Sequence, residues 1–436
     1  MSLVIFAILF FTGIFCWGKT SPWESTLGVD LRYEGKYFPQ EFGGDETNAN
    51  IQLIDIIPYY RVKYKDSWRF LIKPTLEASP GNKSSEEQFW ADPTEAYVQW
   101  KRDPLAVQVG YNLVTWGVTD GYNPVDVINP KQYFDPMHSK KKGVLSLMIS
   151  ESLAWFDYDL YYIPINSGAT LPGEESRWLP REVYIPYDPA NNTVLILPPN
   201  LRYHYGDTTN LEDALNNNFG LRLQKHLGPV DLAVSGYEGA ASFPIIQPVF
   251  TGTIVQVSPK IVVDVDPDVI LNRFNYKVRQ GGFSFVSSQW DFLFKYQTSY
   301  SQSVGDNSLL PGWLHENVAA LEKTFQIPDG MFIAVLQYSF LNSEKQNDSN
   351  VSVTEIFRRA WMLGMKMQWR EVWSFGALGL YDERHGSSLQ EYSIGRRFLD
   401  TMTVSLTADL FDGPSDTPLG VYNKNDSYSL AVSASF

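Results

Sequence analysis

The sequence predicts an all-β protein, a closed antiparallel transmembrane β-barrel of about eighteen strands, with sixteen as the alternative. Three observations predict it. The first two are about eighteen runs of roughly ten alternating apolar and polar residues, and connections that are alternately short and long. The third is an aromatic-rich composition, with 25 Tyr, 26 Phe and 13 Trp. A barrel needs apolar residues only at every second position, so it requires no long apolar stretch.

The run at residues 54–64 illustrates the alternation. Successive side chains of a strand point to opposite faces, so a period of two indicates a strand. On one side lie Ile54, Ile56, Pro58, Tyr60, Val62 and Tyr64, and on the other Asp55, Ile57, Tyr59, Arg61 and Lys63. The runs lie near residues 26–38, 50–64, 68–79, 90–101, 105–117, 143–152, 154–165, 218–226, 229–240, 271–286, 289–302, 315–326, 330–343, 355–369, 373–382, 389–398, 401–412 and 427–436.

The connections between these runs sort by length. Every second one is very short, as in Lys65-Asp66-Ser67, Arg102-Asp103-Pro104, His226-Leu227-Gly228, Pro328-Asp329-Gly330 and Leu399-Asp400. The intervening ones are mostly longer, at 39–49, 80–89, 118–142, 166–217, 241–270, 303–314, 344–354 and 413–426. Short turns at one end and long loops at the other are typical of outer-membrane barrels. A soluble sandwich or propeller is the alternative, but such folds seldom sort their loops in this way.

The N-terminal region predicts export. Residues 3–15 form an apolar run as long as a signal-peptide core and shorter than a membrane-spanning helix. Cys16 and Gly18 occupy the −3 and −1 positions of a cleavage site before Lys19. We therefore expect a signal peptide at 1–18 and a single barrel domain at 19–436. A retained anchor is the alternative, because no Lys or Arg precedes the run.

The last ten residues, SYSLAVSASF, continue the alternation to the final Phe436, with Tyr428 on the same face. In a closed barrel the last strand pairs with the first, so neither has a free edge. The terminal aromatic resembles the C-terminal signal by which Gram-negative outer-membrane proteins are handed to their insertion machinery. That resemblance implies a location in the cell outer membrane, with membrane lipid and the barrel-assembly machinery as partners.

If the apolar face meets lipid, the alternate residues line a lumen. A barrel of about eighteen strands is wide enough for an aqueous passage. The wall residues that we expect are Arg61, Lys63, Arg69, Lys73, Arg222, Lys277, Arg279, Arg358 and Lys366, with Lys101, Lys295, Arg370 and Arg397. The inward acidic set is smaller: Asp55, Glu77, Glu95, Asp231, Asp291, Glu322, Glu391 and Asp409. Cations on the wall would favour small polar solutes, anionic ones included; alternatively, the inward charges merely pair across strands.

The formal charge of the whole chain is −14, which argues against nucleic acid as a partner, because binding phosphate needs clustered cations. The negative excess therefore lies largely in the loops, as in 166–217.

The segment 116–138 is expected to be a compact loop. Its Asn-Pro pairs and its glycines forbid a continuing strand and favour tight turns, which aspartate side chains can hold. Such a loop could fold into the lumen and narrow it, or stand outside as a rigid knob, and we expect the inward fold. The expected constriction residues are Trp116, Asp120, Asn123, Pro124, Asp126, Asn129 and Pro130.

This segment resembles a group of poorly characterised porin-like outer-membrane proteins, in which a glycine-containing strand ends in Trp-Gly and leads into an Asn-Pro-x-Asp loop. The matching residues are Gly110, Trp116, Gly117, Asp120, Asn123, Pro124, Asp126, Asn129 and Pro130. The group usually has Gln after the strand glycine, where this chain has Asn112. The architecture is also similar, more weakly, to barrels that export polysaccharide.

Nothing in the sequence indicates an enzyme. The five histidines have no neighbouring Ser, Asp or His at a spacing typical of a triad or metal site. The acidic run Asp264–Asp268 resembles the start of a calcium loop, but Val269 stands where Gly is needed and Asn275 where Glu is needed. We therefore expect no cofactor, no metal and no catalytic residue. The sequence predicts a channel, and the alternative is a non-conducting barrel whose loops 166–217 and 241–270 bind a ligand or partner.

Overall fold

The computed structural model describes residues 22–41, 48–180, 193–196, 198, 201–345, 353–415 and 417–436. The expected signal peptide at 1–18 lies outside these residues. No helix in these ranges is both long and apolar enough to cross a membrane.

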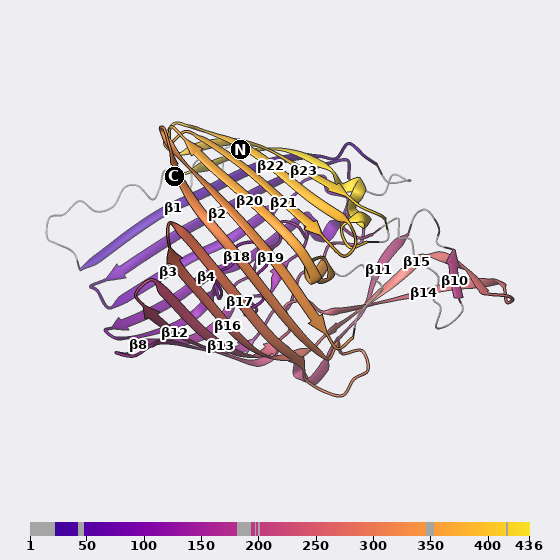
Figure 1. Ribbon diagram of the computed structural model, residues 1–436, viewed down its shortest axis with the longest axis horizontal. Helices are drawn as coiled ribbons and strands as arrows, with labels where there is room; N and C mark the ends of the chain where they lie inside the picture. Colours follow the sequence, from indigo (N-terminus) through magenta and orange to yellow (C-terminus); the bar gives the residue numbers. More distant parts are fainter. Residues whose placement is uncertain are drawn as a thin grey trace.

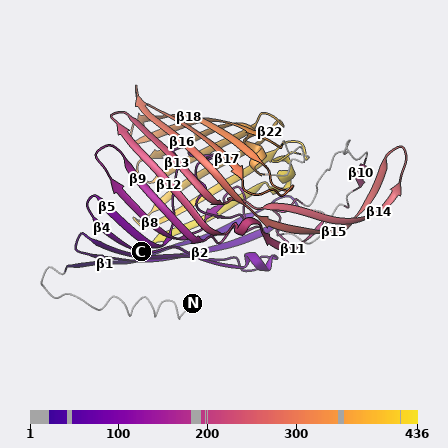
Figure 2. The same cartoon turned by 90° about the horizontal axis from the view of Figure 1, so that it is seen from below.

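Eighteen strands form one closed antiparallel ring (Figures 1 and 2). Each strand pairs with its neighbours along the chain, and the last pairs with the first over Asp30↔Ser435 to Tyr37↔Tyr428. The predicted closed barrel is therefore confirmed, with eighteen strands and not sixteen. The strands of the ring are β1 (Trp23–Tyr37), β2 (Asn50–Tyr64), β3 (Trp68–Ala78), β4 (Phe89–Arg102), β5 (Leu105–Asn112), β8 (Val144–Ser152), β9 (Asp157–Ile165), β12 (Asn216–Leu227), β13 (Val230–Ala240), β16 (Lys277–Gln289), β17 (Phe292–Ser303), β18 (Trp313–Ile327), β19 (Gly330–Ser343), β20 (Arg359–Trp369), β21 (Trp373–Asp382), β22 (Ser387–Phe398), β23 (Met402–Asp412) and β24 (Ser427–Ser435).

Four further strands form a separate sheet that projects from one end of the ring (Figures 1 and 2). Its members are β10 (Thr193–Ile196), β11 (Arg202–Asn210), β14 (Ile245–Gln256) and β15 (Ile261–Asn275). Two expectations are corrected here. The run at 271–286 belongs to two strands that meet at Tyr276, and 241–270 is largely strand. The acidic run Asp264–Asp268 lies within β15, where Asp268 pairs with Arg202 at 2.8 Å.

Short elements complete the described chain. A two-stranded ribbon, β6 (Lys131–Gln132) with β7 (Lys140–Lys141), lies in the connection between β5 and β8. The 3₁₀ helices are η1 (Ser85–Glu87), η2 (Leu211–Asp213), η3 (Val353–Arg358) and η4 (Gly420–Asn425), all in the longer connections. We call the two ends of the ring the short-turn end, which holds Lys65–Ser67, and the long-loop end.

The outer face of the ring is apolar and has aromatic side chains near both ends. Leu27, Ile72 and Leu406 are more than half exposed between these ends. At the short-turn end the rings of Trp23 and Tyr64 lie 4.3 Å apart, and at the long-loop end those of Tyr300 and Trp313 lie 6.3 Å apart. An apolar band between two aromatic belts is typical of a barrel in a bilayer.

The ring closes at its short-turn end through the last residue. Val29 and Phe436 exchange both backbone hydrogen bonds, each at 3.0 Å. The side chain of Phe436 is 69% exposed and that of Tyr428 is 51% exposed, so both aromatics of the predicted assembly signal are accessible. Beside this closure lies Gly28, where a Cβ atom would meet the Tyr59 ring and the Phe436 carbonyl oxygen at 2.6 Å.

We predict that Gly28→Val destabilises the closed barrel by about 1–3 kcal/mol, because overpacking at the seam displaces the last strand. The measurement is the urea midpoint of the folded band in semi-native gel electrophoresis. Gly236→Val is the matched control, because a Cβ at this strand glycine has no atom within 4 Å. Equal midpoints for the two variants would show that the seam tolerates the added side chain.

Candidate functional site

The connection between β5 and β8, residues 113–143, lies inside the ring, and we call it the lumen loop. Its residues contact side chains on the inner faces of strands around the ring. Thr119 bonds to Gln297 on β17, Lys140 to Glu77 on β3, and Lys295 on β17 to Asp120. The loop thus crosses the interior.

Asn129 holds the two ends of the lumen loop together. Its Oδ1 atom accepts a hydrogen bond from the Val114 amide at 2.7 Å. Its Nδ2 group donates to the carbonyl oxygens of Asn112 at 2.9 Å and Lys142 at 2.7 Å. Asn129 is 1% exposed, so these three partners replace water completely. The loop therefore leaves and re-enters the ring at adjacent points.

The first arm of the loop packs on β9 and β12. Trp116 is 1% exposed, and its ring lies edge-on to that of Tyr161 at 6.0 Å. A Cβ atom at Gly220 would lie 2.9 Å from the Trp116 ring and 3.2 Å from Ile128. Because Gly220 has no side chain, the Trp116 indole can pack directly against the wall.

The middle of the loop packs against the wall formed by β17 and β18. The Tyr122 hydroxyl donates to Glu316 on β18, and its ring stacks on Phe357 at 4.2 Å between centroids. Lys295 bridges Asp120 at 2.8 Å and Glu322 at 2.7 Å. The loop therefore spans the lumen from β12 to β18.

The returning arm carries cations to acidic wall residues. Lys140 pairs with Asp55 on β2 at 3.0 Å and Glu77 on β3 at 2.6 Å. Burial alone would lower the pKa of Lys140, but Glu77 and Asp55 outweigh it and raise that pKa. Both carboxylates are buried, so the lysine satisfies charges that water does not reach.

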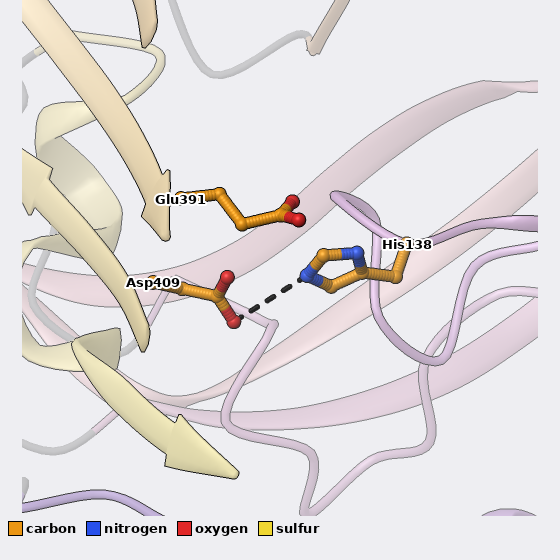
Figure 3. Close-up of side chains that lie close together, drawn as sticks. All are labelled: His138, Glu391 and Asp409. Atoms are coloured by element: carbon orange, nitrogen blue, oxygen red, sulfur yellow. Dashed lines mark hydrogen bonds and ion pairs between the residues drawn. The ribbon is translucent and has the colours of Figure 1, made fainter. Parts of the chain in front are cut away.

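The same arm brings His138 to β22 and β23 (Figure 3). Its Nε2 atom lies 3.4 Å from Oδ2 of Asp409, and Glu391 lies beside both. Lys36 on β1 contacts Asp135 at 2.9 Å and Asp409 at 3.5 Å. Burial would lower the pKa of His138, but Asp409 and Asp135 raise it to about 9.

The structure brings all seven expected constriction residues together in the lumen loop. Asp126 accepts a bond from the Trp116 amide at 3.3 Å and pairs with Lys141 at 2.6 Å. Asn123 donates to the Trp116 carbonyl at 2.8 Å. The carbonyls of Pro124 and Pro130 accept bonds from Gln280 at 3.0 Å and from Lys142 at 2.8 Å. These residues hold the loop's shape and its seat on the wall.

Other residues that fasten the loop to the wall carry no local sequence motif. Tyr122, His138 and Lys140 act on partners that are distant in the sequence, at separations of 194, 271 and up to 85 positions. The sequence contains one indication of these contacts. The two-residue alternation places Asp55, Glu77 and Asp409 on the inner face, so their partners were expected in the lumen.

Most of the expected wall cations lie on the inner face. Arg61 and Lys63 share the face of β2 that carries Asp55, and Arg69 and Lys73 share that of β3 with Glu77. Lys366 shares the inner face of β20 with Met362, and Arg222 bonds to Asp159 at 2.8 Å and the Thr115 carbonyl at 3.4 Å. Arg61, Lys63, Arg69 and Lys366 are exposed to the lumen.

Three wall residues are placed elsewhere. Gln280, Gly282 and Ser284 face the lumen, so Lys277 and Arg279 lie on the outer face of β16. Arg279 pairs there with Glu238 at 2.9 Å. The reason is that both cations lie at the long-loop end of the outer face, beyond its apolar band. Arg358 lies in η3, buried against Glu355 at 2.6 Å, because β20 begins one residue later.

No family model and no curated protein matches this sequence. Among solved structures, OccK2 (OpdF) of Pseudomonas aeruginosa is similar over 95% of this chain and 98% of its own, with 10% identity and a TM-score of 0.50. OccAB2 of Acinetobacter baumannii is similar over 96% and 99%, with 10% identity and a TM-score of 0.50. A mutant of the Rh. blastica porin aligns over 95% and 100%, with 11% identity and a TM-score of 0.42. These likenesses concern the barrel fold; the Trp-Gly group and the polysaccharide-export similarity stay predictions.

We predict that Asn129→Ala loosens the lumen loop by about 1–3 kcal/mol, because it leaves buried backbone groups without partners. Hydrogen exchange of peptides from 113–143 should accelerate while the ring strands stay protected. Asn307→Ala is the control, since the Asn307 side chain accepts a bond from the amide of Leu309 in an exposed connection. Unchanged hydrogen exchange in the loop would mean that Asn129 is not needed to hold the lumen loop in place.

Proposed function

We propose that this protein is an outer-membrane channel through which small polar solutes pass passively, and that the lumen loop sets its constriction. The observation that carries the proposal is a closed ring of eighteen strands whose interior holds the lumen loop, fastened to its wall. A ring of this size leaves a water-filled passage unless segments fill it. The proposed role is transport, with no covalent chemistry.

The surface supports the membrane location. The apolar outer band with aromatic belts matches a bilayer, and the short turns at one end match the periplasmic side of such barrels. Membrane lipid would then cover the outer face. The barrel-assembly machinery would receive the last strand, whose aromatics Tyr428 and Phe436 are exposed.

The distribution of charge supports a preference for anions. In the long-loop half of the lumen, the acidic residues Asp55 and Glu77 are both paired with Lys140. Toward the short-turn end, Lys295 pairs with Glu322 and Lys101 with Asp103, but five other inward cations have no ion-pair partner within the described ranges. These cations are Arg61, Lys63, Arg69, Lys73 and Lys366. An anion in that half would meet positive charge on these five side chains that no ion pair neutralises.

A non-conducting barrel that binds a ligand or partner is the second candidate. Its support is the projecting sheet, where Ile254 and Val255 are 60% and 56% exposed. The lumen loop also reaches several sides of the ring, as a plug would. Conductance separates the two candidates, because a plugged barrel is silent in a planar bilayer.

We predict that the purified protein gives single-channel steps, and that replacing 115–141 with a Gly-Ser linker of about six residues raises the conductance severalfold. The short linker suffices because Asn129 bonds to both Val114 and Lys142, which places the two ends close together. Gel mobility establishes that both proteins are folded. Silence of both proteins would favour the binding role, and equal conductance would remove the loop from the constriction.

We predict that neutralising Arg61, Lys63, Arg69 and Lys73 together, with Gln at each position, lowers the anion-to-cation permeability ratio by about twofold or more. The measurement is the reversal potential in a KCl gradient, which should move toward the potassium value. The matched control neutralises Lys277 and Arg279 on the outer face and should leave the potential unchanged. An identical shift in both variants would count against a selective cationic wall.

A further inference from the structure

We propose that His138, Glu391 and Asp409 form a zinc-binding site that fastens the lumen loop to β22 and β23. One ligand atom from each residue lies within 4.8 Å of the others (Figure 3). One neutral imidazole nitrogen and two carboxylate oxygens are ligands that Zn²⁺ accepts, and a water molecule would complete its tetrahedral shell.

The two carboxylates are placed together by the sheet itself. Glu391 on β22 and Asp409 on β23 are direct cross-strand partners on the inner face. Like charges directly opposite one another destabilise a strand pair unless a cation lies between them. His138 approaches this pair from the loop, so the three residues converge from two independent parts of the fold (Figure 3).

Both carboxylates retain free capacity to bind. Asp409 is 4% exposed, yet its Oδ1 atom has no hydrogen-bond partner. Its Oδ2 atom accepts a bond from Ser427 at 2.9 Å, which fixes the orientation of the carboxylate. For Glu391, the described part of the chain shows neither a hydrogen bond nor an ion pair of the side chain. A buried carboxylate oxygen without a donor is costly, and a metal ion would satisfy it.

The local charge also matches a divalent ion. Asp135, Glu391 and Asp409 supply three negative charges, and Lys36 supplies one positive charge at 2.9 Å from Asp135 and 3.5 Å from Asp409. With a neutral imidazole, two negative charges remain. These match the two positive charges of Zn²⁺, which binds imidazole in its neutral form. The histidine ligand selects against Ca²⁺ and Mg²⁺, which prefer all-oxygen sites.

The test uses the full-length protein, folded in detergent and freed of metal with a chelator. Calorimetric titration with ZnCl₂ should show one tight equivalent, and Co²⁺ in its place should give the visible absorption of a tetrahedral site with a nitrogen ligand. His138→Asn, Glu391→Gln and Asp409→Asn should each weaken zinc binding at least tenfold. An excess of Ca²⁺ should not compete.

Two further variants make the result decisive. His315→Gln should keep wild-type affinity, because His315 faces away from the lumen, opposite in parity to Glu316. Lys36→Met should tighten zinc binding several-fold, because the lysine competes for Asp409. His138 lies in the loop, so its variant remains informative even if a strand variant misfolds. Wild-type zinc affinity in His138→Asn, or competition by Ca²⁺, would overturn the proposal, and neither readout depends on conductance.

Discussion

The closed ladder of backbone hydrogen bonds is the constraint on which everything else in this structure depends. Each ring strand pairs on both sides, and β24 returns to β1, so the sheet has no free edge. In a closed ring the inner face surrounds a lumen. Because it does not pack against a second sheet, it does not need to be apolar. Charged residues such as Arg61 and Asp55 can then occupy it.

Within that ring, charge is divided along the barrel axis. Buried carboxylates are concentrated in the long-loop half, where Lys140 and His138 of the lumen loop pair with them. The short-turn half concentrates exposed cations, and the loop does not reach them. The loop therefore offsets negative charge in the long-loop half, and the net charge of the lumen differs between its two halves.

The strands could be predicted from the sequence because every ring strand alternates with period two and every second turn is short. The prediction was wrong where the alternation runs on past a ring strand. At 271–286 it joined β15 to β16 across Tyr276, and it placed Lys277 and Arg279 on the inner face. Beyond the apolar band, the outer face of a barrel can also carry polar residues. A polar residue there is therefore not necessarily on the inner face.

The lumen loop was predictable as a compact segment, because Asn129, Asp126 and the Asn-Pro pairs hold it locally. Its partners on the wall were not predictable individually. His138 and Asp409 are 271 positions apart, and only the register of β22 with β23 places Glu391 beside them. Period two assigns a residue to a face, but height along the barrel follows from strand register, which a single sequence does not reveal.

The anchoring of the lumen loop next to the seam has a consequence for the order of assembly. Lys36 belongs to the first strand, and Asp409 to the strand before the last, where Ser427 of β24 orients it. These groups are neighbours only after the two ends of the chain have met. The loop precedes most of the strands in the sequence, yet it can complete these contacts only after β24 has paired with β1.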